Sequence, residues 1–435
     1  MKRSQKIYKP INLLRILMCI AVFLYHMGIL KGGYLGVCVF FVLSGYFSCI
    51  SAFKKENFSI LEYYKNKFIR IYLPLIVTVF ISLFAVSLVK EIGWFNLKPE
   101  STSVIFGYNN FWQLDANLDY FARHIDSPFM HLWYISIILQ FEIVFPFVYS
   151  ILKKIGDKIH KSLPCIILAI LSVLAVVFFV HCGKTSSMMY TYYDTLARSF
   201  SLIFGLAVGF VHSYYRPFIP SFMRGRIVSR MVFTIYLVLL IASFFLIEPN
   251  SSYFTISMVI VTLIGCRLLD YGVIHPKYRQ SKADKFIGYL ANISYEIYLI
   301  QYPIIFLFQY IDVGTFYIPL VITLTFITSM LIHYIFDFKG AYGKTKWLKV
   351  LLCFVIIKVG CFGVKVYVEA IDHTNEMKEL ENQLAENEEK MQKRQEEYAL
   401  NIAKEREEWN KILENLEDGE KKLEELVSQI PIVGI

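Results

Sequence analysis

The chain has 435 residues, of which 56% are hydrophobic, 17% are aromatic and only 18% are charged. Soluble domains carry about 25% charged residues, and a mean hydropathy of +0.50 implies more apolar surface than a water-soluble fold can hide. The composition therefore predicts an all-α integral membrane protein and excludes soluble α/β, fibrous and disordered classes.

Charge divides the chain into two blocks. Residues 1–368 carry 35 basic and 16 acidic side chains, whereas residues 369–435 carry 9 basic and 19 acidic ones. The basic residues of the first block lie in short segments between apolar runs, which is typical of a cytoplasmic membrane face and not of nucleic-acid binding. We therefore predict a membrane domain over 1–368 and an acidic helical linker over 369–430.

Apolar runs long enough to cross a bilayer recur through the first block. A hydrocarbon core of about 30 Å needs about 20 apolar residues per helix. With the N-terminus inside, the predicted cytoplasmic segments hold 26 Lys and Arg residues and the outer segments hold five, so the linker is expected outside the cell. We expect eleven transmembrane helices, at residues 11–30, 34–53, 71–89, 132–152, 163–181, 196–213, 231–247, 252–269, 287–311, 315–336 and 350–368.

The acidic linker is dense in Glu, Lys, Leu and Gln, which predicts one long helix with its break at Asp418-Gly419. Apolar residues recur every seven positions in two runs with a phase shift between them. This pattern predicts a coiled coil, and hence a homo-oligomer; a solvated charged helix is the alternative. The two runs are Met377, Leu384, Met391 and Tyr398, then Ile402, Trp409, Leu416, Leu423 and Ile430.

Ionisable residues inside predicted spans are candidate functional groups, because each costs at least about 2.5–3.5 kcal/mol on insertion scales. Arg15 and His26 are eleven residues apart, so they share one helix face about 16 Å apart along the axis. His131 and Glu142 repeat this spacing. The alternative is a structural ion pair of Arg15 with a glutamate. The full set is Arg15, His26, Glu142, Arg198, Glu296, Lys358 and Lys365.

The predicted span 287–311 carries hydroxyl groups around a proline. Tyr295, Tyr298 and Tyr302 fall on one helical stripe. Pro303 has no N–H to donate to the carbonyl of Leu299, so we expect a kink and a free backbone acceptor there. Together with the neighbouring amide of Gln301, these groups predict a polar cavity within the membrane.

Five stretches, taken together, resemble the acyltransferase-3 family of integral-membrane acyltransferases over roughly residues 8–340. Three positions depart from the family pattern: Cys38 stands where an acidic residue is frequent, Lys67 replaces an arginine, and Gln301 replaces a histidine. The small Ser44 and Gly45 of the second stretch also permit close helix approach. The five stretches are Leu14-Arg15 with His26 at Arg-x10-His spacing, Phe40–Tyr46, Lys67–Pro74, His131-Leu132-Trp133 and Ser294–Pro303.

The Gln-Tyr-Pro form at 301–303 is similar to the Gram-positive peptidoglycan O-acetyltransferases, in which a helical linker precedes an extracellular SGNH-type domain. Residues 431–435 resemble the first strand of such a domain, and we expect its serine-bearing remainder beyond residue 435. The resemblance implies cytoplasmic acetyl-CoA as donor. It also implies that acetyl crosses the membrane to an extracellular glycan, most often a muramic-acid hydroxyl.

The resemblance also suggests roles for the candidate residues. His26 would be the nucleophile or base for the thioester, and Arg15, Lys67 and Arg70 would bind the anionic CoA. We expect no metal, and membrane lipid around the spans. Two alternatives remain: a stand-alone O-acyltransferase of lipid-linked sugar or exopolysaccharide, and a transporter of a small metabolite. Further catalytic candidates are Arg15, Glu142, Tyr298 and Tyr302, and acceptor-side or supporting candidates are His131, Arg198, Ser44, Glu296 and Gln301.

Overall fold

The structure is a computed structural model of the chain, which divides into two compact units, Met1–Val364 and Lys365–Ile435. Each unit is described by itself. The structure describes the backbone, but not the side chains, of residues 226, 343–376, 409, 424 and 427. The described backbone comprises residues 9–87, 97–118, 120–121, 127–215, 226–249, 252–274, 281–311, 314–336 and 343–428.

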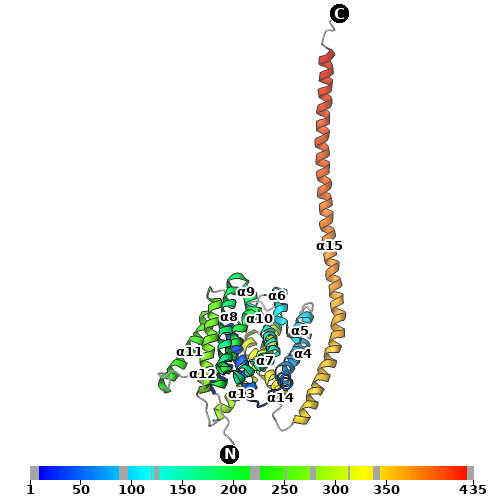
Figure 1. The fold of residues 1–435 in the computed structure, drawn as a ribbon. Helices are drawn as coiled ribbons and strands as arrows, with labels where there is room; N and C mark the ends of the chain where they lie inside the picture. Colours follow the sequence, from blue (N-terminus) through cyan, green and yellow to red (C-terminus); the bar gives the residue numbers. More distant parts are fainter. Residues whose placement is uncertain are drawn as a thin grey trace, which may run out of the picture. The chain divides into compact units, whose positions relative to one another are not determined.

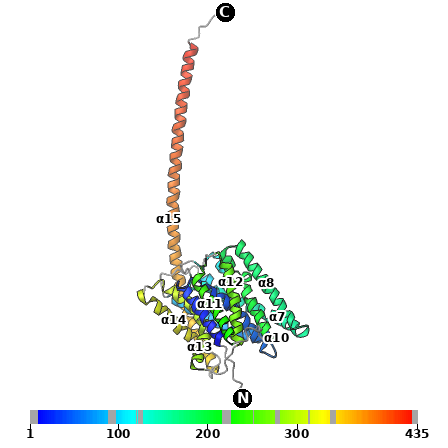
Figure 2. The same ribbon diagram turned by 90° about the vertical axis from the view of Figure 1, so that its left-hand side faces the viewer.

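Helices form all the regular structure in these described ranges, and Figures 1 and 2 show those of the first unit as a bundle. Short 3-10 turns at Gly33–Leu35, Met130–Leu132 and Gly314–Phe316 lead into α2, α7 and α14. The helices are α1 Lys9–His26, α2 Gly36–Phe53, α3 Ile60–Lys67, α4 Leu73–Ser87, α5 Leu97–Ile105, α6 Asn109–Asp115, α7 Trp133–Lys158, α8 Ser162–Thr185, α9 Met188–Tyr193, α10 Thr195–Tyr214, α11 Arg226–Leu246, α12 Phe254–Ile274, α13 Lys282–Leu307, α14 Tyr317–Phe336 and α15 Gly343–Ser428.

Ten helical segments within the described residues are long and apolar enough to cross a membrane, and they match the first ten predicted spans. The fold class is therefore confirmed as an all-α, multi-pass membrane protein. The eleventh predicted span, 350–368, falls within the helical backbone of α15. Its side chains, including Lys358 and Lys365, lie outside the described residues.

The third span begins earlier than the prediction of residue 71. The helical segment starts at Ile60, where the Ser59 hydroxyl accepts a hydrogen bond from the Glu62 backbone N–H at 3.4 Å and caps α3. A π-helical turn, Phe68–Tyr72, then joins α3 to α4. The charged first turns hid this start, because the hydropathy of the run rises only after Arg70.

Close helix packing holds the first unit together. α1 packs mainly against α13, and α2 packs mainly against α10. A Cβ atom at Gly45 would collide with the carbonyl oxygen of Leu202, and one at Gly205 would collide with that of Val42. The predicted role of Gly45 in close approach is therefore confirmed, and α10 contributes a matching glycine.

The linker sequence is helical, as predicted, but its predicted break is wrong. α15 continues through Asp418 and Gly419 to Ser428, because a single glycine lowers helix stability by only about 1 kcal/mol. Pairs at i,i+4, such as Glu386–Lys390 and Glu407–Lys411, support the helix. The coiled coil stays a prediction, and the described members of its apolar stripe are exposed.

Candidate active site

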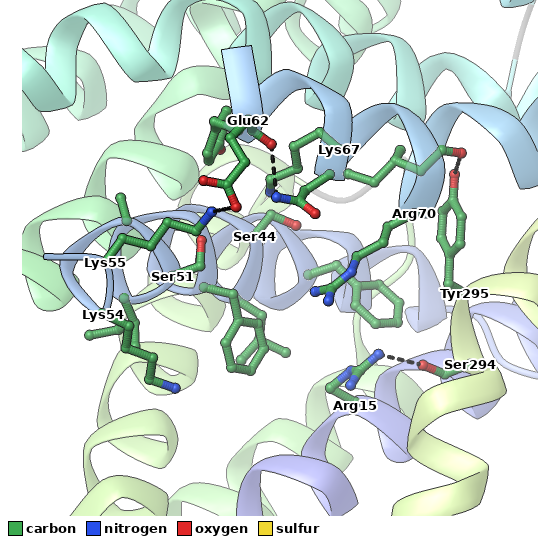
Figure 3. A pocket seen from close by; sticks show the side chains of 18 of the residues that line it. Arg15, Ser44, Ser51, Lys54, Lys55, Glu62, Lys67, Arg70, Ser294 and Tyr295 are labelled. Carbon is green, nitrogen blue, oxygen red and sulfur yellow. Dashed lines mark hydrogen bonds and ion pairs between the residues drawn. The ribbon is translucent and has the colours of Figure 1, made fainter. Parts of the chain in front are cut away.

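A cavity of about 860 Å³ opens between α1, α2, α3, the π-helical turn, α7 and α13. Its walls combine basic side chains with hydroxyl groups and aromatic rings. Ser44 and Tyr134 share a 3.4 Å hydrogen bond in one wall. Figure 3 shows part of this lining. The polar lining residues are Arg15, Ser44, Ser51, Lys54, Lys55, Glu62, Tyr63, Asn66, Lys67, Arg70, Tyr134, Ser294, Tyr295 and Tyr298.

The cavity is strongly basic. Five cationic side chains line it against the single carboxylate of Glu62, which forms an ion pair with Lys55. The guanidinium groups of Arg15 and Arg70 extend into the same space (Figure 3). A cavity with this balance attracts a polyanionic ligand, because low-dielectric walls strengthen the field of the cations.

Arg15 does not form the structural ion pair that the sequence left open as an alternative. Its Nη2 donates to the Ser294 hydroxyl at 3.4 Å. Glu142 instead pairs with Lys67, and Glu296 pairs with His333 of α14 at 2.9 Å. Among the described residues, Arg15 therefore has no carboxylate within ion-pair distance, and Glu296 acts on its guanidinium only as a nearby charge.

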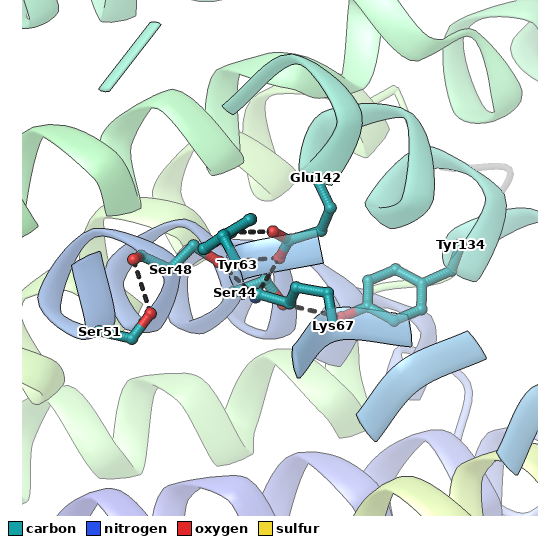
Figure 4. A network of polar contacts seen from close by, with 7 residues as sticks. All are labelled: Ser44, Ser48, Ser51, Tyr63, Lys67, Tyr134 and Glu142. Carbon is teal, nitrogen blue, oxygen red and sulfur yellow. Dashed lines mark hydrogen bonds and ion pairs between the residues drawn. The ribbon is translucent and has the colours of Figure 1, made fainter. Parts of the chain in front are cut away.

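Lys67 belongs to a buried polar network at the edge of the cavity (Figure 4). Its Nζ lies 2.5 Å from Glu142 Oε1 and donates to the Ser48 hydroxyl at 2.8 Å. Ser48 donates to the same carboxylate at 2.7 Å, and the Tyr63 hydroxyl donates to its other oxygen. Glu142 thus holds Lys67 in place, so only part of the lysine charge is available to a ligand.

The π-helical turn separates the two cations that the sequence grouped together. Lys67 ends α3 and faces Glu142, whereas Arg70 lies within the turn and faces the cavity. π-turns inside helices are frequent at functional sites because they change the direction of successive side chains. Of the pair, Arg70 is therefore the cation that faces the cavity without the carboxylate that holds Lys67.

His26 lies outside the cavity lining, in a buried cluster at the end of α1. Its Nε2 shares a 2.7 Å hydrogen bond with the hydroxyl of Tyr120, which lies between the spans. Burial raises the pKa of the Tyr120 hydroxyl well above its ordinary value, so this hydroxyl keeps its proton at neutral pH. Arg15 and His26 thus lie on the same helix, with Arg15 in the cavity wall and His26 in the buried cluster.

His131 joins the same cluster from the 3-10 turn that precedes α7. The rings of His26 and His131 lie 6.0 Å apart between centroids, and the Tyr302 ring lies 4.7 Å from the first and 4.9 Å from the second. The hydroxyl of Tyr302 donates to Met130 Sδ at 3.5 Å. The sequence candidates His26, His131 and Tyr302 therefore meet in one place, which we call the histidine cluster.

Tyr298 connects the cavity to the histidine cluster. Its ring lines the cavity and lies 5.3 Å from the ring of Tyr134 and 5.3 Å from that of His131. Its hydroxyl donates to the backbone carbonyl of His131 at 2.6 Å. Of the two candidate tyrosines on α13, Tyr298 thus faces the cavity and Tyr302 faces the imidazoles.

Arg198 and Gln301 are fully buried. Neither lines the cavity, and within the described residues neither hydrogen-bonds to His26 or His131. Arg198 lies among four aromatic rings and donates to Cys38 Sγ at 3.5 Å. The amide of Gln301 has no hydrogen-bond partner among the described residues. The rings around Arg198 are Phe41, Trp133, Phe179 and Tyr192, at 5.0–5.9 Å from its guanidinium carbon to the ring centroid.

Several residues of the site carried no signal that sequence reasoning used. Tyr120 lies in a loop without periodicity. Ser48 and Tyr63 lie within helices, and neither is an ionisable group of the kind that sequence reasoning singled out. Lys54 could have been found, because it adjoins the end of a predicted span. For a metal, the described residues offer no group of three or more His, Cys, Asp or Glu side chains that could bind one.

The family model of the acyltransferase-3 family, described as an acyltransferase domain, matches residues 8–338. The chain belongs to this family. It is similar to the O-acetyltransferase OatA of Staphylococcus aureus, with 26% identity over 336 residues that cover 70% of this chain and 52% of the relative. It is also similar to the peptidoglycan O-acetyltransferase OatA of Listeria monocytogenes, with 28% identity over 319 residues, 69% of this chain and 50% of the relative.

The chain thus spans about half the length of the curated relatives it matches. No solved structure matches it. The matched region contains both the basic cavity and the histidine cluster, because each is built from residues between Arg15 and Tyr302. Membership of an acyltransferase family therefore rests on the part of the chain that carries the candidate site.

Proposed function

We propose that this protein is a membrane O-acetyltransferase that takes acetyl from cytoplasmic acetyl-CoA and delivers it to a hydroxyl of an extracellular glycan, peptidoglycan muramic acid in the first instance. The observation that carries the proposal is the basic cavity whose wall, at Tyr298, contacts the buried histidine cluster. This reaction needs a binding site for a polyanionic donor and a group that transfers a proton. The basic cavity would provide the first, and the histidine cluster would provide the second.

The charge distribution supports a cytoplasmic donor. Lys54, Lys55, Lys67 and Arg70 line the cavity and belong to one segment that the positive-inside rule assigns to the cytoplasm. The phosphates of CoA would meet Arg70 and Lys54 near this segment, and Arg15 lies deeper. His26 lies about 16 Å further along α1, on the side that faces the acceptor in this orientation.

The proposal is tested by CoA release from acetyl-CoA by the purified chain in detergent, followed by acetylation of a muramic-acid glycan. Release that depends on the glycan supports it. Absence of release under any acceptor would contradict it. Release with a lipid-linked sugar and none with peptidoglycan fragments would keep the enzyme class and change the acceptor.

Arg70→Ala is expected to raise the apparent KM for acetyl-CoA about tenfold, which corresponds to about 1.4 kcal/mol of binding free energy. The reason is that Arg70 is exposed in the cavity wall, where it would pair with a phosphate. The effect should shrink at high salt, because exposed charges are screened. Lys65→Ala is the matched control, since Lys65 is exposed on α3 outside the cavity lining. An equal rise in both variants would assign the effect to general surface charge.

Lys67→Ala should behave differently from Arg70→Ala. It removes the partner of Glu142, a carboxylate with 6% side-chain exposure, and breaking a buried ion pair on one side costs about 3–5 kcal/mol. We therefore expect a lower melting temperature in detergent as well as lower activity, and Lys67→Met combined with Glu142→Gln should recover stability. A melting temperature equal to that of the wild type would show that the pair contributes little.

Tyr298→Phe is expected to spare donor binding and to lower delivery of acetyl across the membrane. The substitution keeps the ring in the cavity wall but removes the hydroxyl that binds the His131 carbonyl. The measurement is CoA affinity beside acetylation of an outside glycan, with the protein in sealed vesicles that enclose acetyl-CoA on the cytoplasmic face. Tyr302→Phe is the comparison. Equal loss of binding and delivery in Tyr298→Phe would make it a donor-pocket residue.

A further inference from the structure

A histidine side chain hydrogen-bonds to the backbone carbonyl that Pro303 leaves without a partner in its own helix. Proline has no N–H for the carbonyl four residues earlier in its helix, and that carbonyl belongs to Leu299 of α13. His131 Nε2 lies 3.1 Å from this oxygen. The predicted free acceptor is therefore real, and its partner comes from a segment 168 residues away in the sequence.

This contact fixes which ring nitrogen of His131 carries hydrogen. A carbonyl oxygen only accepts hydrogen bonds, so Nε2 must be the donor. In the neutral imidazole, Nδ1 is then a bare acceptor. Nδ1 of His131 is buried and has no hydrogen-bond partner among the described residues. A preset proton acceptor thus lies unpaired inside the protein.

The surroundings of His131 place this acceptor in the candidate active site. Its ring stacks on Tyr302, faces His26 at 6.0 Å and contacts Tyr298 of the cavity wall. Its backbone carbonyl is held by the Tyr298 hydroxyl. The ring is therefore fixed by its ring nitrogen and by its backbone, which is the arrangement expected of a group that must present one nitrogen in one direction.

We propose that His131 is a second catalytic base, and that the Leu299 carbonyl freed by Pro303 is the positioning group that fixes its tautomer. The inference rests on the proposed acetyl transfer. Nδ1 takes the proton of the acceptor hydroxyl while the hydroxyl oxygen bonds to the acetyl carbon. The carbon–sulfur bond of the thioester breaks, and the thiolate takes the proton back from the imidazolium. No oxidant or reductant is needed, and the products are the acetyl ester and CoA–SH.

His131→Gln separates this role from a structural one. The glutamine amide N–H can replace Nε2–H as the donor to Leu299, but it offers no basic nitrogen. We expect acetyl transfer to fall by about 10²–10⁴-fold, the usual contribution of a general base, with acetyl-CoA affinity and the melting temperature unchanged. His160→Gln, at an exposed histidine whose ring hydrogen-bonds to Ser162 and lies outside the cavity lining, is the matched control and should retain full activity.

The outcomes distinguish this inference from the proposed function. A wild-type protein that releases no CoA would overturn the proposed function, whereas an active wild type with an equally active His131→Gln variant would overturn only the catalytic role of His131. A second measurement does not depend on activity. In ¹⁵N spectra of histidine-labelled protein, the signals missing from His131→Gln should report a bare Nδ1 and a protonated Nε2. The opposite tautomer would refute the assignment, and Pro303→Ala, which returns an N–H to Leu299, should disturb it.

Discussion

His26→Ala is expected to lower acetyl transfer from acetyl-CoA by at least about 10²-fold and as much as about 10⁴-fold, the range that a lost general base or nucleophile produces. His26 is the only imidazole on the helix face that also carries Arg15. Its Nε2 is bound to the Tyr120 hydroxyl, and its ring contacts Tyr302. The measurement is CoA release by purified protein in detergent.

The control for His26→Ala must separate the loss of chemistry from the loss of packing, because His26 is buried, with a relative exposure of 8%. His26→Gln retains a similar length and a hydrogen-bonding group for Tyr120, so it should restore the melting temperature without restoring activity. A variant that folds normally and releases CoA at the wild-type rate would exclude His26 from the reaction and leave His131 as the base.

Arg15→Lys is expected to lower kcat/KM by at least about tenfold, although the charge is formally retained. A guanidinium presents a planar fork of donors to phosphate or to a carbonyl, which a single ammonium does not reproduce. Arg15 lines the cavity and has no carboxylate within ion-pair distance among the described residues, so we expect the substitution to act on the ligand rather than on an ion pair. Steady-state kinetics with acetyl-CoA measures the effect.

Ser294→Ala is the matched control for Arg15→Lys. It removes the hydroxyl that Arg15 contacts at 3.4 Å, a length beyond the usual range of protein hydrogen bonds. We expect a less than threefold loss. If Ser294→Ala and Arg15→Lys lose activity equally, the function of Arg15 is to hold α13 against α1. A fully active Arg15→Lys variant would leave Arg15 as a residue that only balances charge.

Local chemistry explains what could be predicted. Ten spans follow from runs of apolar residues, because the bilayer demands about 20 of them per helix whatever the neighbours are. The shared face of Arg15 and His26 follows from helical periodicity. The free carbonyl of Leu299 follows from the absence of an N–H in Pro303. Each of these needs only the covalent chain and one helix.

The partners of the ionisable groups needed the tertiary structure. From the sequence, Arg15 could neutralise Glu142 or Glu296, yet Glu142 binds Lys67 and Glu296 binds His333. The choice depends on the rotation of each helix about its axis and on the π-helical turn at Phe68–Tyr72. Hydropathy predicts neither the rotation of a helix nor the π-helical turn, because it measures how apolar a segment is and not which neighbour each side chain faces.

The sequence by itself determined the membrane class of this protein, the helices and the residue types of its site, since each depends on interactions between near neighbours in the chain. Only the tertiary structure brought His131 against His26 and the Leu299 carbonyl, and only it added Tyr120 from a loop without periodicity. The physical reason is that side-chain contacts between distant segments are set by the packing of whole helices. A candidate site made of four segments is a property of that packing.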